Sequence, residues 1–325
     1  MMVENFSKQI SVAPMMDWTD RHDRAFLRLF SRDIVLYTEM ITSHALMHGD
    51  RQHLLAYDAI EQPLVLQLGG SEPGDLAHCA AWGEQAGYQA INLNVGCPSP
   101  RVSKGRFGAC LMLEPSLVAK CVASMQAAVS IPITVKCRIG VDNNDSYAEL
   151  TNFIQQVASV GCQEFIVHAR KAWLQGLSPK QNREIPPLHY DVVLQLKQDF
   201  PDLTIIINGG IKTLAQVKQL LPQVDGVMIG REAYHNPYFL AEIANYYFNT
   251  PLPSRHAIMA KFIPYIEQQL CLGVRLNSIT RHVLGLFQAQ RGAGIWRRYL
   301  SQNAHLPGAG TQVIYEALAL VAENE

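Results

Sequence analysis

The sequence predicts a (β/α)8 barrel followed by a smaller, all-helical domain. Eight short apolar runs rich in β-branched residues recur over the first 235 residues, without the polar–apolar alternation of half-exposed strands. Such runs are typical of strands buried on both faces of a parallel sheet. Helix-like segments lie between most of them, and eight strand–helix units close into a barrel. After about residue 236 the apolar periodicity becomes helical.

The eight predicted strands follow one another along the chain. They are ISVAPM (10–15), IVLYTEM (34–40), PLVLQLGG (63–70), AINLNVGCP (90–98), ITVKCRIG (133–140), EFIVHAR (164–170), LTIIINGG (203–210) and DGVMIGRE (225–232). Three of the segments between them carry helix boundary signals. Gly87 ends the helix predicted from residue 72, Gly161 ends the one predicted from residue 145, and Thr213 caps the one that follows it.

Four further segments have helical periodicity, namely 239–248, 256–270, 275–288 and 311–323. We therefore expect a barrel domain over residues 1–240 and a helical domain over 241–325. From Gln268 to Tyr315 there is no Asp or Glu, whereas five arginines fall within this stretch, at positions 275, 281, 291, 297 and 298. Such a stretch is typical of a surface that binds a polyanion, although arginines can also simply solvate a helix face.

Composition limits the remaining possibilities. The 325 residues are 48% hydrophobic and 17% charged, a globular balance, and the net charge of −1 gives no indication of nucleic acid. The start of the chain lacks a signal-peptide pattern and no run of 18 apolar residues occurs, so we expect a cytoplasmic protein without membrane contact. The seven cysteines include no C-x-x-C pair, which argues against a zinc site or a disulfide framework.

Most predicted strands end in a residue that can do chemistry. Gln67, Cys97, Lys136 and His168 lie at or near the ends of four of them. Each has an ordinary structural explanation when taken singly, but a closed barrel brings all eight carboxyl ends to one face, where active sites are built. Glycine-rich segments after the last two strands, Asn208–Gly210 and Gly230–Arg231, match the usual phosphate site of such barrels.

Seven segments of the chain resemble the tRNA-dihydrouridine synthase family. They are APMMDWTDRHDRAF, QLGG, NLNVGCPSPRVSKGRFGACLM, TVKCRIG, VHARKAWLQGLSPKQNREIPPL, INGGI and IGREAYHNP, and the Cys-Pro loop is the most specific. Most of the wider family has Gly-x-Thr-Asp after the first Ala-Pro-Met, where this chain has Met-Asp-Trp-Thr-Asp. That departure resembles the A subfamily, which acts on uridines 20 and 20a of the tRNA D loop.

The resemblance implies a flavoenzyme that reduces the 5,6 double bond of uridine in tRNA. NADPH is the implied reductant, although the sequence does not distinguish NADPH from NADH. Cys97 is implied as the proton donor, and no metal or protein partner is implied. The residues implied to hold FMN are Pro14, Met15, Met16, Gln67, Lys136, His168, Asn208, Gly209, Gly210, Gly230 and Arg231. The residues implied to contact tRNA are Asn94, Lys180, Arg183, Arg297 and Arg298.

The chemistry of the reaction agrees with these implied roles. Reduction of uracil needs a hydride at C6 and a proton at C5, and therefore a two-electron carrier together with an acid. A thiol with a pKa of about 8.5 is mostly protonated at neutral pH and can donate. Because nearby cations favour the thiolate, we expect Arg101, Lys104 and Arg106 to face phosphates rather than Cys97.

Three other functions remain compatible with the residues themselves. The first keeps the flavin but acts on a free pyrimidine, as in a dihydroorotate or dihydropyrimidine oxidoreductase. The second is a Schiff-base aldolase in which Lys136 attacks a phosphosugar. The third is an RNA-binding module on an inactive barrel.

Overall fold

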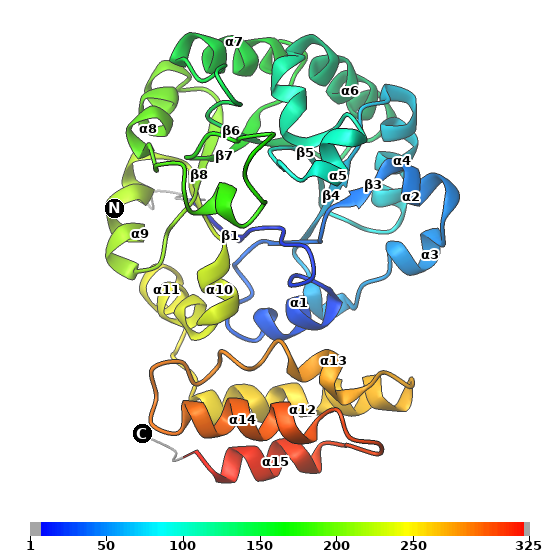
Figure 1. Cartoon of the computed structure of the whole chain (residues 1–325), viewed down its shortest axis with the longest axis vertical. Coiled ribbons are helices and arrows are strands. Elements are labelled where there is room, and N and C mark those ends of the chain that lie inside the picture. Colours follow the sequence, from blue (N-terminus) through cyan, green and yellow to red (C-terminus); the bar gives the residue numbers. More distant parts are fainter. Residues whose placement is uncertain (1–7, 322–325) are drawn as a thin grey trace, which may run out of the picture. The chain divides into compact units, whose positions relative to one another are not determined.

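Eight parallel strands form a barrel in the computed structural model, which describes residues 8–321 (Figure 1). They are β1 (Gln9–Val12), β2 (Leu36–Tyr37), β4 (Leu64–Gly69), β5 (Ala90–Val95), β6 (Ile133–Arg138), β7 (Glu164–His168), β8 (Thr204–Asn208) and β9 (Gly226–Ile229). Each overlaps one predicted run, so all eight predictions are confirmed. A short additional strand, β3 (Ile41–Thr42), pairs with β4 beyond the end of β2.

Parallel pairing runs around the barrel in the order β1, β9, β8, β7, β6, β5, β4, β2. The ring is completed beside β1 by the residue before β2. The Val12 N–H donates to the Val35 carbonyl, and the Val35 N–H donates to the Ile10 carbonyl, each at 2.9 Å. Closure leaves the barrel with no free sheet edge at this seam.

Helices surround the strands of the barrel (Figure 1). They are α2 (Ser43–His48), α3 (Arg51–Leu54), α4 (Pro73–Gln85), α5 (Pro100–Lys104), α6 (Pro115–Ala128), α7 (Tyr147–Ala158), α8 (Tyr190–Asp199) and α9 (Leu214–Leu220), with short 3-10 helices at Gly108–Leu113, Gln181–Arg183 and Leu221–Gln223. The predicted helix boundaries are confirmed. Thr213 caps α9 by accepting the Gln216 N–H, while Gly87 and Gly161 follow α4 and α7 with φ of +91° and +101°.

The barrel interior changes from apolar to polar along the strands. Buried side chains of Ala13, Tyr37, Val65, Ile166, Ile206 and Met228 pack together as one cluster. Because side chains on one face of a strand recur every two residues, the next inward positions are Gln67 on β4, His168 on β7 and Asn208 on β8. The apolar layer therefore supports a polar layer nearer the carboxyl ends of the strands.

A second unit groups three separate parts of the chain, Met16–Ile34, Asp58–Gln62 and the residues from Arg231 onward. Its helices are α1 (Arg21–Arg28), α10 (Arg231–His235), α11 (Tyr238–Phe248), α12 (Arg255–Cys271), α13 (Leu276–Thr280), α14 (Ala293–Asn303) and α15 (Gln312–Ala319), with a 3-10 helix at Ala59–Glu61. The division into domains at residue 240 stays a prediction, because grouping by contacts does not test which part folds independently.

Two parts of this unit differ from the sequence-based expectation. The helix predicted over 275–288 is wrong beyond Thr280, where the chain continues as turns. A Cβ at Gly285 would lie 2.5 Å from the His235 carbonyl oxygen, so this segment passes directly against the backbone of α10. Helix α14 was not predicted, since Gly292 and Gly294 obscure its start. Its buried Trp296 donates its indole N–H to the Val283 carbonyl at 3.0 Å.

A buried ion pair joins two of the three parts of the second unit. Arg24 Nε lies 2.6 Å from Glu61 Oε2, and the Glu61 side chain is fully buried. Burial raises the pKa of the Glu61 carboxyl, and the charge of Arg24 opposes that rise. Arg24 also donates to the Thr19 carbonyl at 2.7 Å.

We predict that Arg24→Met lowers the free energy of unfolding by about 3–5 kcal/mol, because it leaves the Glu61 carboxylate buried without its cation. Urea unfolding of the variant and the parent measures this difference. The exposed Arg32 provides the control, and Arg32→Met is expected to change stability by less than about 0.5 kcal/mol. Equal stability of the two variants would contradict the assigned role of the pair.

Candidate active site

Neighbouring strands place the polar side chains of the barrel side by side. In the parallel registers, Gln67 lies opposite Asn92, Asn94 opposite Lys136, and His168 opposite Asn208. These residues come from five consecutive strands, β4 to β8, and all except Asn92 lie in the carboxyl-terminal half of their strands. The sequence therefore places amides, an ammonium group and an imidazole at one end of the barrel, as predicted.

A chain of amide hydrogen bonds crosses β4, β5 and β6. Asn92 donates to Thr134 Oγ1 at 2.9 Å and accepts from Gln67 Nε2 at 2.7 Å. The Gln67 oxygen accepts in turn from Asn94 Nδ2 at 2.9 Å. Asn94 Oδ1 then accepts the backbone N–H of Cys97 at 3.0 Å. The orientation of the Gln67 amide is thereby coupled to the start of the loop that carries Cys97.

Lys136 lies at the centre of this polar end, half-buried on β6. Its Nζ donates to Asn208 Oδ1 at 3.1 Å, and Asn208 donates to the Met228 carbonyl at 2.8 Å. Burial, and then the charge of Arg138 two residues along the same strand, lower the pKa of Lys136 to about 8. The ammonium group is therefore a desolvated cation that an anion would stabilise.

Sequence reasoning missed Arg138, which is almost fully buried. Its Nε donates to the Gly96 carbonyl at 2.9 Å, and its terminal nitrogen donates to the carbonyls of Lys171 and Asn182 at 3.0 and 3.1 Å. It thus joins the Cys97 loop to the loop after β7. The available signal was a second cation two residues after Lys136 in an apolar strand, which must share its face.

His168 is held neutral at the end of β7. Burial, and then the charges of Arg138 and Lys136, lower the pKa of its imidazole well below the ordinary value. Glycine is required beside it, because a Cβ at Gly209 would lie 2.7 Å from His168 Cδ2 and the residue has φ of +123°. At neutral pH the imidazole can donate from one nitrogen and accept at the other.

The glycine segments after β8 and β9 differ in how much space lies beside their backbone. Gly210 has φ of +65°, and a Cβ there would meet Leu188 at 2.5 Å. A Cβ at Gly230 would meet nothing within 4 Å, so space remains in front of this residue. The open backbone at Gly230 suits close approach by an anion. Arg231 follows Gly230 as the first residue of α10.

The Cys97 thiol is half-buried at the start of a loop that contains α5 and the 3-10 helix 108–113. Burial raises the pKa of the Cys97 thiol, while Arg138, Arg183 and Lys136 act in the opposite direction. The thiol therefore stays protonated at neutral pH. Its cationic neighbours come from β6 and from the 3-10 helix 181–183, whereas Arg106 lies 3.7 Å from Glu114 in an exposed ion pair.

The remaining predicted residues lie at several places in the two units. Met15 packs against the barrel core, and Met16 is 56% exposed. Lys180 and Arg183 are exposed in the loop between β7 and α8. Arg297 and Arg298 are exposed on α14 of the second unit. Their roles toward FMN and tRNA stay predictions, as does the role of Pro14.

The residues that the structure describes include no candidate metal cluster, membrane-spanning helix or disulfide. Among residues 8–321, no group of three or more His, Cys, Asp or Glu side chains has the arrangement of a metal site. No helix in that range has the length and apolar character needed to cross a membrane. All seven cysteines, which fall within it, are free thiols.

Comparison with known proteins decides the family. The model of the family described as dihydrouridine synthase (Dus) matches residues 11–321. The chain belongs to the dihydrouridine synthase family. Enzymes of this family reduce uridines in tRNA to dihydrouridine, and the chain is one of these oxidoreductases.

Individual dihydrouridine synthases match over almost the whole chain. A tRNA-dihydrouridine(20/20a) synthase of Vibrio cholerae is 58% identical over 98% of this chain and 98% of its own. Proteins with the same name from Shewanella oneidensis and Synechocystis are 58% and 57% identical, covering 96% and 95% of this chain and 93% of each relative.

A solved structure supports the fold. A 2-naphthoyl-CoA reductase complex superposes with a TM-score of 0.56 over 73% of this chain and 50% of that chain, at 9% identity. At this identity the likeness concerns the barrel fold alone.

The surroundings of Cys97 predict slow alkylation. We expect iodoacetamide to modify Cys97 more slowly than the exposed Cys271 at pH 7.5, because burial restricts access and disfavours the reactive thiolate. The rate at Cys97 should continue to rise above pH of about 8.5, the ordinary thiol pKa. Peptide mass spectrometry of partly labelled protein gives both rates. Preferential labelling of Cys97 below pH 8 would instead indicate a thiolate.

Proposed function

We propose that this dihydrouridine synthase reduces uridines 20 and 20a in the D loop of tRNA, using bound FMN and NADPH as the reductant. The observation that carries the proposal is the placement of the half-buried cation Lys136 and the protonated thiol Cys97 at one polar end of the barrel. The positions 20 and 20a come from the names of the relatives, which match nearly full length.

The residues at the barrel end fit FMN in charge and in shape. Lys136 offers an ammonium group with a single side-chain hydrogen bond, to Asn208. Gln67 and His168 offer neutral donors and acceptors, and the open backbone at Gly230 suits a phosphate, with Arg231 adding charge; Gly209 and Gly210 allow the chain to turn tightly beside His168 and Leu188. We propose that these residues, with Pro14, Met15 and Met16, hold the cofactor. Bound FMN would supply the hydride for C6 of uracil.

Cys97 supplies the other half of the reduction in this proposal. Its thiol proton goes to C5, so that hydride and proton together saturate the 5,6 bond. The thiolate left behind is stabilised by the charges of Arg138 and Arg183 until water reprotonates it. Asn94 and Arg138 hold the backbone of the loop at Cys97 and at the preceding residue, and so position the sulfur.

A uridine of folded tRNA reaches a barrel end only when it is flipped out of its stack, at a cost of a few kcal/mol. We propose that phosphate contacts offset this cost. Lys180 and Arg183 are exposed in the loop after β7, where the strand ends converge. Arg297 and Arg298 are exposed on α14, within the stretch that lacks carboxylates. In this proposal residues 241–325 form the tRNA-binding domain of a cytoplasmic enzyme that needs no protein partner.

The lowered pKa of Lys136 also suits the nucleophile of a Schiff-base aldolase. Membership of the dihydrouridine synthase family removes that function, together with the inactive barrel. A free pyrimidine as substrate is disfavoured by the relatives, whose names specify tRNA.

We predict that Cys97→Ala lowers dihydrouridine formation by roughly two or more orders of magnitude, the usual scale for loss of a general acid. Dihydrouridine in tRNA is quantified by mass spectrometry after incubation with NADPH. Flavin content and the rate of flavin reduction by NADPH serve as controls and should stay close to the parent values. Unchanged activity would show that another group, or water, delivers the proton.

The pKa of Lys136 predicts a pH effect on cofactor binding. Since the ammonium group loses its proton as the pH rises through about 8, FMN affinity of the flavin-free protein should fall between pH 7 and pH 9. Flavin fluorescence titrations measure this affinity.

Two variants provide matched controls for that titration. Lys136→Met should bind FMN weakly at every pH, and Lys136→Arg should show no fall because its charge does not titrate in this range. A parental fall that persists in Lys136→Met would assign the effect to another group.

A further inference from the structure

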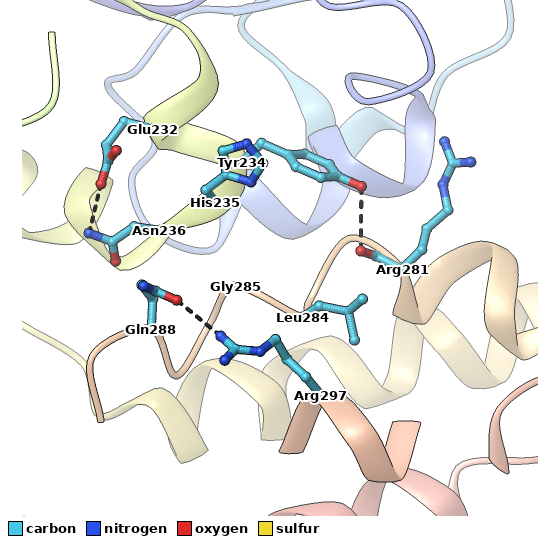
Figure 2. Close-up of a pocket in the computed structure, with 9 residues that line it drawn as sticks. All are labelled: Glu232, Tyr234, His235, Asn236, Arg281, Leu284, Gly285, Gln288 and Arg297. Atoms are coloured by element: carbon cyan, nitrogen blue, oxygen red, sulfur yellow. Dashed lines mark hydrogen bonds between the residues drawn. The ribbon is translucent and has the colours of Figure 1, made fainter. Parts of the chain in front are cut away.

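The second unit contains a pocket of about 420 Å³ that the proposed reaction does not use (Figure 2). It lies among α10, the turns that follow α13, and α14. Its lining residues, all within the second unit, are Glu232, Tyr234, His235, Asn236, Arg281, Leu284, Gly285, Gln288 and Arg297. This volume falls within the range of about 300–1,000 Å³ that is typical of small-ligand sites.

One wall of the pocket is aromatic and rigid. Tyr234 stacks on Trp18 with ring centroids 4.6 Å apart and an angle of 11° between the rings. His235 packs edge-on against the same Trp18 at 5.0 Å, and the Tyr234 hydroxyl donates to the Arg281 carbonyl at 3.4 Å. His235 is exposed and Tyr234 is half-buried, so His235 is the part of this aromatic wall that is most accessible to a flat ligand.

The other walls present donors and acceptors that are already oriented. Arg297 donates to Gln288 Oε1 at 3.0 Å, and Asn236 donates to Glu232 Oε1 at 3.2 Å (Figure 2). The Arg281 guanidinium points away from these side chains in Figure 2 and binds the Asp17 carbonyl and Asp20 instead. Arg297 is therefore the cation that faces the ligand space, with a carboxylate and two amides around it.

This combination matches a nucleotide better than a simple anion or an apolar ligand. Unpaired RNA bases pack on aromatic side chains and bond to amides and carboxylates through their edges, while arginine binds the phosphate. A free phosphate would leave the aromatic wall unused and would be repelled by Glu232. An apolar ligand would desolvate four polar side chains and could not bond to the donors and acceptors that they leave open.

We propose that the pocket binds one unstacked nucleotide of the tRNA substrate, other than the uridine that is reduced. The base packs against Tyr234 and His235 with its edge toward Asn236 and Glu232, and Arg297 binds a phosphate beside it. The inference rests on the proposed function, because it takes tRNA as the substrate. RNA is favoured over a free mononucleotide because Arg275, Arg291 and Arg298 are exposed in the same carboxylate-free stretch, where further phosphates of one strand can bind.

Two pairs of variants test the pocket, each with a matched control on the same helical unit. Gln288→Trp fills the pocket from an exposed position, and Gln302→Trp adds the same bulk at an exposed position of α14 outside the lining. Arg297→Ala removes the pocket cation, and Lys261→Ala removes an exposed cation of α12 that does not line the pocket.

We expect Gln288→Trp to weaken binding of unmodified tRNA transcripts by about 5- to 150-fold, the range for loss of one stacked base. Arg297→Ala should weaken it by about 10- to 150-fold, the range for loss of a charged hydrogen bond. Each control should weaken it several-fold less. Flavin content and flavin reduction by NADPH should not change in any of the four variants. Equal losses in Arg297→Ala and Lys261→Ala, together with equal affinities of the two tryptophan variants, would overturn the inference.

Transcripts that carry a single abasic nucleotide identify the occupant. At the position whose base occupies the pocket, Gln288→Trp should cause no further loss of affinity, whereas losses at other positions should add. Additive losses at every position would overturn the base-binding role. If the parent protein itself neither binds tRNA nor forms dihydrouridine, the proposed function fails together with this inference. A parent that does both while its pocket variants match their controls overturns this inference alone.

Discussion

The hydrogen bonds of Asn94 connect the barrel wall to the reactive loop. The Asn94 side-chain amide accepts the backbone N–H of Cys97 and donates to Gln67. It therefore fixes the positions of both the proposed acid, Cys97, and a proposed cofactor ligand, Gln67. Because a buried amide with a missing partner costs about 1–3 kcal/mol, the network favours a single arrangement of its members. The proposed chemistry needs such an arrangement, since an acid that moves by an ångström loses much of its effect.

Burial acts on the titratable groups of this end in opposite directions. It raises the pKa of Cys97 and lowers the pKa of His168 and of Lys136, because each neutral form is easier to desolvate. The result is a neutral acid and a neutral imidazole beside cations that lack full solvation. Arg138 strengthens this pattern with a positive charge that is almost fully buried. Such a field suits an anionic cofactor and a substrate that acquires negative charge while it is reduced.

The second unit shows how distant segments come to form one surface. Asp20, which follows β1 in sequence, accepts from the buried His282, and Trp18 stacks on Tyr234. Burial raises the pKa of Asp20, but the bond and charge of His282 outweigh this and lower it to about 2. The loop after β1 is thus part of the second unit. The aromatic wall of the pocket depends on Trp18 of this loop, which packs against Tyr234 and His235.

The sequence by itself determined the barrel, because strands buried on both faces leave continuous apolar runs and helices between them need recognisable caps. It also predicted that Gln67, Cys97, Lys136 and His168 lie at the same end of the barrel, since closure of a parallel barrel brings its strand ends together however the side chains pack. Only the tertiary structure decided the role of Arg138, the end of α13 at Thr280 and the pocket around Arg297. Each of these depends on contacts between residues far apart in the chain, such as Gly285 against the backbone of His235, and local periodicity carries no information about such contacts.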